Sequence, residues 1–293
     1  MHALETATGI AFKNILFLTD FTEASEAALA YAMGLANHYK AELYLAHASN
    51  PTVPPETTTA RFLETVVENS RKELAKLVKE HEIKGTPLFA QGSIEAAFPK
   101  WINEQAIDLV VAGTHGRRGL ERFLMGSTAE FIFRNSTSPV LTVGPHVAMR
   151  PYKDFSVDKI LFPTDLGPHA EVAVTYALSL AREKHARITF MHVVPLAEAF
   201  QRDRTELVVT ARKKLEQLVP SDAQHWSEPE IVVEIGDPAM ELVGFAERER
   251  PDLIVLGLPQ DKKFNSHFRS GVTYKLVSSA PCPVLTIRDT VSG

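Results

Sequence analysis

Residues 113–130 read GTHGRRGLERFLMGSTAE, between a short apolar run and a segment with helical periodicity. The stretch contains four glycines, of which Gly113, Gly116 and Gly126 bear on the argument and Gly119 is the fourth. Glycine permits positive φ angles and lets a phosphate approach the backbone, because no Cβ stands in the way. Ser127 and Thr128 open the following helix, where backbone N–H groups are unpaired and the helix dipole is positive. The stretch therefore predicts either a phosphate-binding loop or an ordinary glycine-rich loop with a serine cap.

Phosphate loops of two other kinds do not match this stretch. The Walker pattern G-x-x-x-x-G-K-[ST] occurs nowhere in the chain, and the G-x-G-x-x-G pattern of dinucleotide-binding folds is also absent. Arg117, Arg118 and Arg122 do bring positive charge into the stretch. From these residues alone, the phosphate loop and the ordinary loop are equally open.

The chain consists of two copies of a repeat of about 145 residues. KNILFLTD at 13–20 matches DKILFPTD at 158–165, near the start of each copy. PVLTV at 139–143 matches PVLTI at 283–287, near the end of each copy. We therefore expect two domains of one kind, 1–147 and 148–293, each of ordinary domain size.

Within the first copy, apolar runs alternate with helical patterns. The apolar runs predict strands at 14–19, 41–48, 86–91, 108–112 and 140–143. Helical spacing predicts a helix capped by Thr22 and further helices at 58–81, 93–105 and 127–135. Pro99 should distort the third of these four helices. This alternation predicts a parallel sheet with helices on both faces, and such sheets bind ligands beyond the carboxyl ends of their strands.

The composition is that of a globular protein, with 45% hydrophobic and 23% charged residues among 293. The net charge is −5 and neither half is strongly basic, so nucleic acid is not an expected partner. No apolar run approaches the roughly 20 residues that cross a bilayer, and the N-terminus lacks the pattern of a signal peptide. A single cysteine, Cys282, and no zinc-site spacing indicate a cytoplasmic protein without a structural metal.

Gly113-x-x-Gly116, nine residues and then Gly126-Ser127 fit the pattern G-2x-G-9x-G-[ST]. Together with the opening ILFLTD and ILFPTD runs and the closing PVLTV and PVLTI runs, it resembles the universal stress protein family. The resemblance covers both copies. It implies an α/β, adenine-nucleotide alpha-hydrolase-like fold: two tandem open, twisted, mostly parallel five-stranded sheets with helices on both faces. It also implies a site for an adenine nucleotide, usually ATP, with Mg²⁺ as a phosphate-bound companion.

The residues that match the family's nucleotide contacts follow the first two strands or lie in the glycine stretch. They are Thr19, Asp20, Ala48, Gly113, His115, Gly116, Arg117, Gly126, Ser127 and Thr128. For Asp20 we favour a base or ribose contact over the alternative of a turn residue. His47 and His192 occupy equivalent places, and a structural role is favoured because the second copy keeps its histidine while losing the glycines.

The second copy, GLPQDKKFNSHFRSGVTY at 257–274, keeps the length of the loop and changes its chemistry. Gln260 replaces Gly116 and Ser270 replaces Gly126. We therefore predict one tightly bound nucleotide per chain, in the first copy. Thr164 and Asp165 persist in the second copy as a remnant adenine pocket.

The fifth strands, at 140–143 and 284–287, would be sheet edges with unpaired backbone groups. Members of the family commonly dimerise through this strand. The resemblance therefore implies an internal pseudo-dimer in which the two fifth strands pair with each other. A homodimer of two chains through another surface is a further alternative.

The function expected is that of a stress-response protein that acts through nucleotide-dependent interaction, with at most slow ATP hydrolysis. No carboxylate or histidine has the spacing of an activated base, so no catalytic residue is assigned. One alternative is an adenylyl-transferring enzyme, although the S-G-G-x-D type of pyrophosphate loop is absent. The other alternative is an interaction scaffold that binds no nucleotide.

Overall fold

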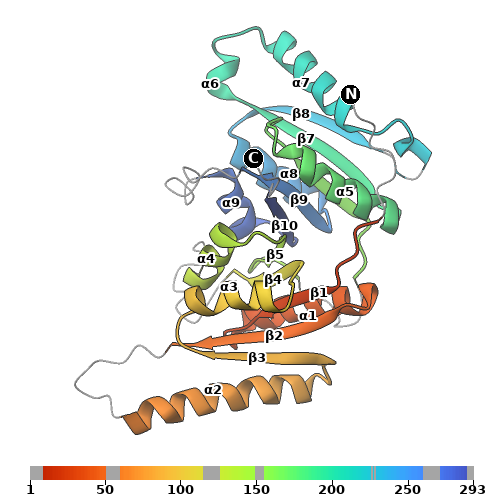
Figure 1. Cartoon of the computed structure of the whole chain (residues 1–293). Coiled ribbons are helices and arrows are strands. Elements are labelled where there is room, and N and C mark those ends of the chain that lie inside the picture. Colours follow the sequence, from red (N-terminus) through yellow and green to blue (C-terminus); the bar gives the residue numbers. More distant parts are fainter. Residues whose placement is uncertain are drawn as a thin grey trace. The chain divides into compact units, whose positions relative to one another are not determined.

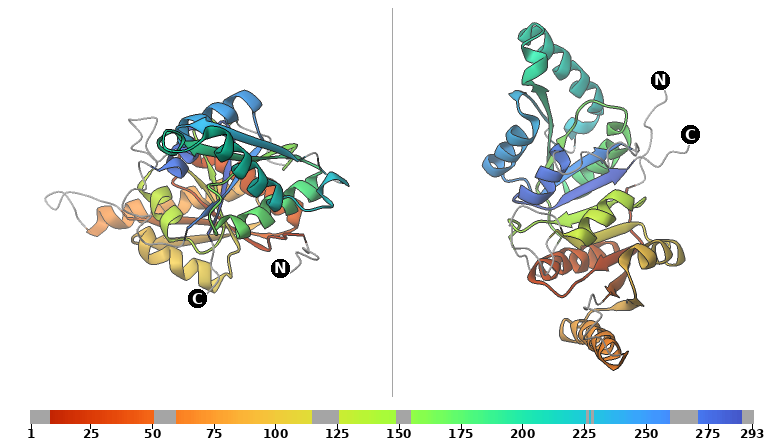
Figure 2. Two further views of the ribbon diagram at one scale, coloured as in Figure 1. Left: turned by 90° about the horizontal axis from the view of Figure 1, so that it is seen from above. Right: turned by 90° about the vertical axis from the view of Figure 1, so that its left-hand side faces the viewer.

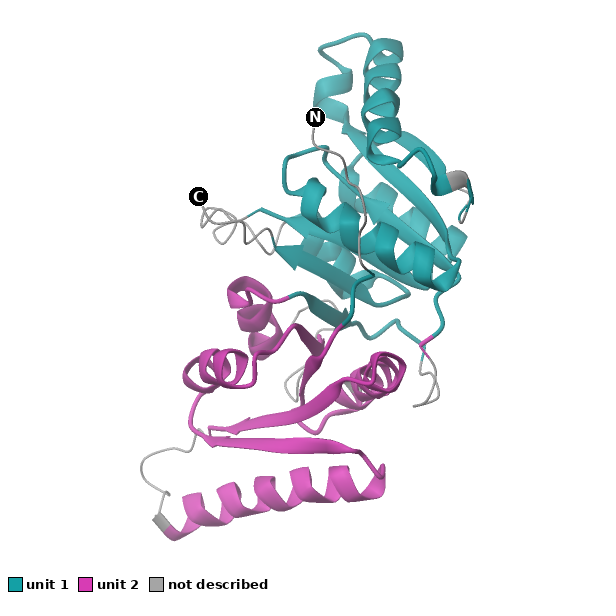
Figure 3. Cartoon of the chain, turned by 45° about the vertical axis from the view of Figure 1, so that its right-hand side comes forward, with its two compact units in different colours: residues 1–11, 139–148, 156–293 teal, residues 12–138, 149–155 magenta. Residues whose placement is uncertain are grey.

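The structure is a computed structural model that describes residues 9–50, 60–114, 126–148, 155–225, 227, 229–259 and 271–288. The chain forms two compact units, coloured separately in Figure 3. Unit 1 comprises residues 1–11, 139–148 and 156–293, and unit 2 comprises residues 12–138 and 149–155. The units therefore do not follow the sequence repeat, because the strand at 140–143 comes from the first copy but belongs to unit 1.

Unit 2 holds four parallel strands in the order β3-β2-β1-β4. Its elements, labelled in Figure 1, are β1 (Asn14–Leu18), α1 (Glu23–Tyr39), β2 (Glu42–Ser49), α2 (Ala60–Glu80), β3 (Gly85–Gln91), α3 (Ile94–Glu104), β4 (Leu109–Gly113) and α4 (Ser127–Asn135). The chain builds outward from β1 to β3 and then crosses back to place β4 on the other side of β1. The strand order therefore reverses between β1 and β4, where ligands of such sheets bind.

Unit 1 holds six strands in the order β5-β10-β9-β6-β7-β8. Its elements are β5 (Val140–Val143), β6 (Lys159–Pro163), α5 (Ala170–Lys184), β7 (Arg187–Pro195), α6 (Leu196–Ala199), α7 (Arg204–Leu218), a 3₁₀ turn (Ala223–His225), β8 (Glu230–Gly236), α8 (Pro238–Glu249), β9 (Leu253–Leu258), α9 (Val272–Ser279) and β10 (Val284–Arg288). All neighbours are parallel except β5 and β10. The corresponding reversal of strand order lies between β6 and β9.

Helices cover both faces of the unit 2 sheet. Ile15, Leu16 and Phe17 in β1 are each 0% exposed, so successive side chains on opposite faces are equally buried. On the face of α3 and α4, the rings of Phe98 and Phe131 pack edge to face with centroids 6.1 Å apart. Each copy contributes five strands with helices between them, which confirms the predicted α/β fold.

The helices of unit 2 begin and end close to their predicted bounds. Thr22 caps α1 as predicted, because its hydroxyl accepts from the N–H of Ser25 and its own N–H donates to the Ser25 hydroxyl at 3.0 Å. Helix α3 continues through Pro99 to Glu104. The long helix α2 lies alongside β3 in the views of Figures 1 and 2. Among the residues described, no helix is both long and apolar enough to cross a membrane.

The fifth strands of the two copies pair with each other inside unit 1. Strand β5 runs antiparallel to β10, with Leu141 opposite Leu285 and Thr142 opposite Val284. The Thr142 hydroxyl donates to the Val284 carbonyl at 3.1 Å, and the Thr286 hydroxyl donates to the Val140 carbonyl at 3.2 Å. The predicted strand pairing is confirmed, and the backbone groups of both edges are used.

Candidate functional site

The carboxyl end of β1 leads into a turn that is held by Thr19. Its N–H donates to the carbonyl of Ala46 at 3.0 Å, which ties the end of β1 to β2. Its hydroxyl accepts from the N–H of Phe21 at 3.0 Å and lies 3.1 Å from the hydroxyl of Ser25. Thr19 is 8% exposed. Its side chain is therefore buried inside the turn, and the neighbouring Asp20 is more exposed.

Asp20 accepts two hydrogen bonds from one residue. Its Oδ1 atom accepts from the N–H of Thr22 at 3.1 Å and from the Thr22 hydroxyl at 2.6 Å. The carboxylate thus has the turn role that the sequence left as an alternative, and its orientation is fixed before any ligand arrives. A contact from Asp20 to a base or ribose remains a prediction.

A left-handed residue follows the aspartate in both copies. Phe21 has φ 62° and Leu166 has φ 63°, at equivalent places of the repeat. Bulky residues rarely adopt this conformation, which costs of order 1–3 kcal/mol where it occurs. The sequence reasoning missed this feature, because only glycine or asparagine would have signalled it. The same strained turn therefore follows an aspartate at the switch of strand order in both copies.

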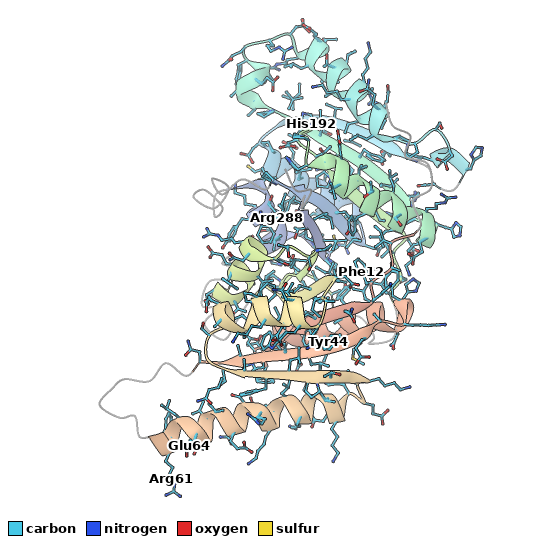
Figure 4. The ribbon with its side chains drawn as sticks, in the orientation of Figure 1. Phe12, Tyr44, Arg61, Glu64, His192 and Arg288 are labelled. Atoms are coloured by element: carbon cyan, nitrogen blue, oxygen red, sulfur yellow. The ribbon has the colours of Figure 1, made fainter. Side chains whose placement is uncertain are left out.

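The two histidines have the structural role that was predicted for them. His47 Nδ1 lies 2.8 Å from the carbonyl of Thr19, and His192 Nδ1 lies 2.8 Å from the carbonyl of Thr164. Each ring thus links the end of its strand to the turn of the neighbouring strand (Figure 4 labels His192). The ring of Phe21 packs on His47 with centroids 4.4 Å apart, which supports the left-handed turn.

The glycine stretch leaves β4 beside this turn. Leu18 and Ala112 are register partners, so Asp20 and Gly113 leave the sheet from neighbouring strands. Ala48 lies near the end of β2 and pairs with Ala90. The sheet therefore brings the first-strand residues, Ala48 and the start of the glycine stretch to one edge.

The far end of the glycine stretch returns to its beginning. The N–H of Gly126 donates to the carbonyl of Thr114 at 2.6 Å, and Thr114 is 0% exposed. His115, Gly116 and Arg117 lie outside the described residues. The hydrogen bond closes the base of the loop, so the start of α4 is set directly beside the end of β4.

Helix α4 begins without a side-chain cap. Its N-cap is Gly126, with φ −62° and ψ 151°, so this glycine is not needed for a positive φ. The N–H groups of the first turn of a helix have no partner within the helix. Ser127 and Thr128 follow as exposed residues of that turn. The arrangement offers backbone donors, two hydroxyls and a positive helix end at the same place.

The second copy differs at the aspartate as well as in the loop. Asp165 Oδ1 lies 3.2 Å from His169 Nε2 and accepts from the N–H of Gly167 at 2.8 Å. The hydrogen bond from His169 lowers the pKa of Asp165. The first copy has Ala24 where the second has His169. Sequence reasoning missed this pair, although an aspartate and a histidine four residues apart at a helix start could have signalled it.

Gly257 is explained by packing in the second copy. A Cβ at this position would lie 2.5 Å from the carbonyl oxygen of His169. The glycine therefore allows β9 to approach the start of α5, and its presence does not indicate a phosphate loop. Residues 260–270 lie outside the described part of the chain. Gly271 caps α9 without a side-chain hydrogen bond, as Gly126 does for α4.

Comparison with known proteins agrees with this geometry. The sequence profile of the universal stress protein family matches residues 11–144 and again residues 156–288. The chain belongs to the universal stress protein family. It contains two family domains in tandem, which together cover most of its length.

This tandem universal stress protein has relatives that match one of its two domains and relatives that match both. A universal stress protein of Methanocaldococcus jannaschii is 30% identical over 139 residues, 45% of this chain and 82% of the relative. One of Mycolicibacterium smegmatis is 25% identical over 292 residues, 94% of this chain and 96% of the relative. The crystal structure of a universal stress protein from Archaeoglobus fulgidus has a TM-score of 0.68 at 17% identity, covering 94% and 98% of the two chains. That structural likeness supports the fold.

Proposed function

We propose that this universal stress protein binds ATP at the carboxyl edge of β1 and β4 and acts by nucleotide-dependent interaction. The observation that carries the proposal is the start of α4, where Gly126 leaves the first turn without a side-chain cap beside the reversal of strand order. A phosphate is well suited to this place, because unpaired N–H groups and the helix dipole both favour an anion.

The chain offers a separate group for each part of the nucleotide. Asp20, oriented by Thr22, would bind the base or the ribose, with the backbone near Ala48 beside it. The phosphates would lie against the first turn of α4, where the Ser127 and Thr128 hydroxyls add donors. Among the described residues, no three His, Cys, Asp or Glu side chains gather as a metal site. Mg²⁺ would therefore be held mainly by the phosphate oxygens, whose charge it would partly neutralise.

Binding without rapid chemistry is the reading that the described residues support. His47, the histidine closest to the turn, contacts the carbonyl of Thr19 through Nδ1, and Asp20 accepts from Thr22. Both side chains therefore serve the turn, which fits a binding site better than an acid–base pair. We further propose a cytoplasmic location, which the single cysteine favours.

Calorimetry with ATP and Mg²⁺ tests the proposal. Ser127→Ala should weaken ATP binding about ten- to hundredfold, because a hydrogen bond to a charged phosphate is worth about 1.5–3 kcal/mol. Gly116→Val should weaken binding further by placing a branched side chain in the motif. Thr65→Val is the control, because the Thr65 hydroxyl bonds only to the carbonyl of Arg61 within exposed helix α2.

Three outcomes separate the candidate functions. Loss of affinity in Ser127→Ala and Gly116→Val, with the control unchanged, supports the proposed site. Equal ATP affinity in all variants places the nucleotide elsewhere. No ATP binding by the native chain supports the scaffold alternative, and release of AMP and pyrophosphate from ATP would support adenylyl transfer.

A further inference from the structure

Unit 1 contains a cavity at the opposite edge of its sheet from the carboxyl ends of the strands. Its volume is about 490 Å³, within the range of about 300–1,000 Å³ of small-molecule sites. It is bounded by the first residues of β6, β7 and β8 and by the end of α8. The lining residues are Lys159, Ile160, Leu161, Arg187, Thr189, Pro229, Glu230, Phe245, Glu249 and Pro251.

Comparison of the two copies explains how the cavity arises. Thr189 stands where the first copy has Tyr44, and Phe245 stands where it has Trp101. Trp101 is 7% exposed, and Tyr44, labelled in Figure 4, is half-buried on β2. Both substitutions replace a larger side chain by a smaller one at the same place. The second copy therefore carries less side-chain volume at this edge of the sheet than the first copy, which has Tyr44 and Trp101 there.

Two cations that line the cavity stand directly opposite each other on neighbouring strands. Lys159 and Arg187 are register partners on parallel strands β6 and β7, so their side chains leave the same face. Like charges at this spacing destabilise a sheet. The first copy has Asn14 opposite Glu42 at the same place. Within the described part of the chain neither cation forms an ion pair, and the Lys159 ammonium donates to the carbonyl of Glu249 at 2.9 Å.

Two carboxylates also line the cavity, Glu230 on β8 and Glu249 at the end of α8. Thr189 and Glu230 are register partners on β7 and β8, and the Thr189 hydroxyl donates to Glu230 Oε2 at 3.1 Å. This bond holds the Glu230 carboxylate one strand away from Arg187 and two strands away from Lys159. Between the charged groups the wall is apolar, formed by the ring of Phe245 and by Ile160, Leu161, Pro229 and Pro251.

We infer that this cavity binds a small zwitterion with an apolar body, the chemistry of a free amino acid or a dipeptide with an apolar side chain. The carboxylate of the ligand lies between Lys159 and Arg187 and relieves their repulsion. Its ammonium group faces Glu230, and its apolar side chain packs on Phe245. This inference does not depend on ATP binding, because the cavity lies at the other edge of the sheet and in the second copy.

Four probes test the charge requirement on the full chain by calorimetry and thermal shift. L-phenylalanine and L-alanyl-L-phenylalanine carry both charges. Comparison of their affinities shows whether the cavity prefers a free amino acid or a dipeptide. N-acetyl-L-phenylalanine lacks the ammonium group, and 2-phenylethylamine lacks the carboxylate. We expect at least one zwitterion to bind about tenfold or more tightly than either single-charge probe. Equal binding of all four probes, or binding of none, overturns the inference.

Variants test the place of binding. Arg187→Gln, at an exposed position that the fold does not need, should weaken the zwitterion about tenfold or more. The double variant Thr189→Tyr with Phe245→Trp restores the side chains of the first copy and should abolish binding. Met240→Ala, 70% exposed on α8 and outside the cavity, should bind as the native chain does. Unchanged affinity in Arg187→Gln would overturn the assignment even if the double variant fails to fold.

Discussion

Asp20 and Asp165 occupy the same place in the two copies and have different partners. Thr22 donates to the first, whereas His169 pairs with the second, so the two carboxylates differ in what they offer a ligand. The aspartates themselves could be predicted from the repeat. Of their partners, His169 could have been signalled by its spacing of four residues from Asp165, whereas the bond from Thr22 to Asp20 depends on a turn that places Phe21 at positive φ. Neither phenylalanine nor leucine is a residue type that signals a positive φ angle.

Replacing His169 should be visible in the titration of Asp165. The hydrogen bond from His169 holds the Asp165 pKa below 3.8, so His169→Ala should raise it towards that value. Because the pKa is lowered in the folded state, the stabilisation is present above pH 3.8 and is lost as pH falls through the lower folded pKa. NMR titration of the carboxyl carbon measures the shift. Exposed His146→Ala is the control, and an equal pKa in both variants would contradict the assignment.

Two glycines of unit 1 should respond in opposite directions to the same substitution. Gly257→Ala should destabilise the protein by about 1–3 kcal/mol, because its Cβ would meet the His169 carbonyl at 2.5 Å. Gly244→Ala, inside α8, should stabilise it by up to about 1 kcal/mol, because its nearest neighbour is the flexible end of Arg248 at 3.4 Å. Urea unfolding measures both. Equal effects would show that β9 and α5 do not approach as closely as described.

Among the helices and strands, the pairing of β5 with β10 is open to a direct test. Thr142→Val and Thr286→Val remove two buried hydroxyls that donate across the pair, with little change in shape. Each should cost about 0.5–1.5 kcal/mol of unfolding free energy. Thr175→Val, whose hydroxyl bonds to Val172 within α5, is a matched control for loss of a local bond. If the cross-strand variants cost no more than this control, the two hydroxyl bonds add nothing to the stability that the backbone pairing provides.

The regular elements of the first copy were predictable because their apolar spacing is strong. The predicted helix at 127–135 has the same bounds as α4, and the predicted strand at 86–91 differs from β3 by one residue. Helix α3 continues through Pro99, since Trp101 and Phe98 bury its apolar side and outweigh the missing hydrogen bond. Helix α6 was not predicted, because four residues are too few for a periodic pattern.

For the complete chain, the asymmetry of the copies predicts one ATP per molecule. Both copies begin the helix after the loop at a glycine without a side-chain cap, but in the second copy His169 engages Asp165 and Gln260 and Ser270 replace the loop glycines. Calorimetry should give a stoichiometry near one ATP per chain, and Ser127→Ala should reduce the affinity for that ATP. Two binding events of similar affinity would refute the asymmetry.

The tandem organisation was predictable, but the composition of the compact units was not. The repeat assigns β5 to the first copy, and the structure groups it with β10 and the rest of unit 1. This grouping depends on a contact between strands 142 or more residues apart, as in the bond from Thr142 to Val284. The repeat alone carries no information about such distant partners, and the pairing of the two strands was expected only from the family resemblance.

The antiparallel pair of β5 and β10 has a consequence for how the protein behaves on dilution. Because both strands belong to one polypeptide, their association is a first-order process and does not depend on how many molecules share the solution. A protein that joined the same strands from two separate chains would dissociate once its concentration fell below the dissociation constant of the dimer. The joined edge of this chain should therefore persist at any abundance of the protein.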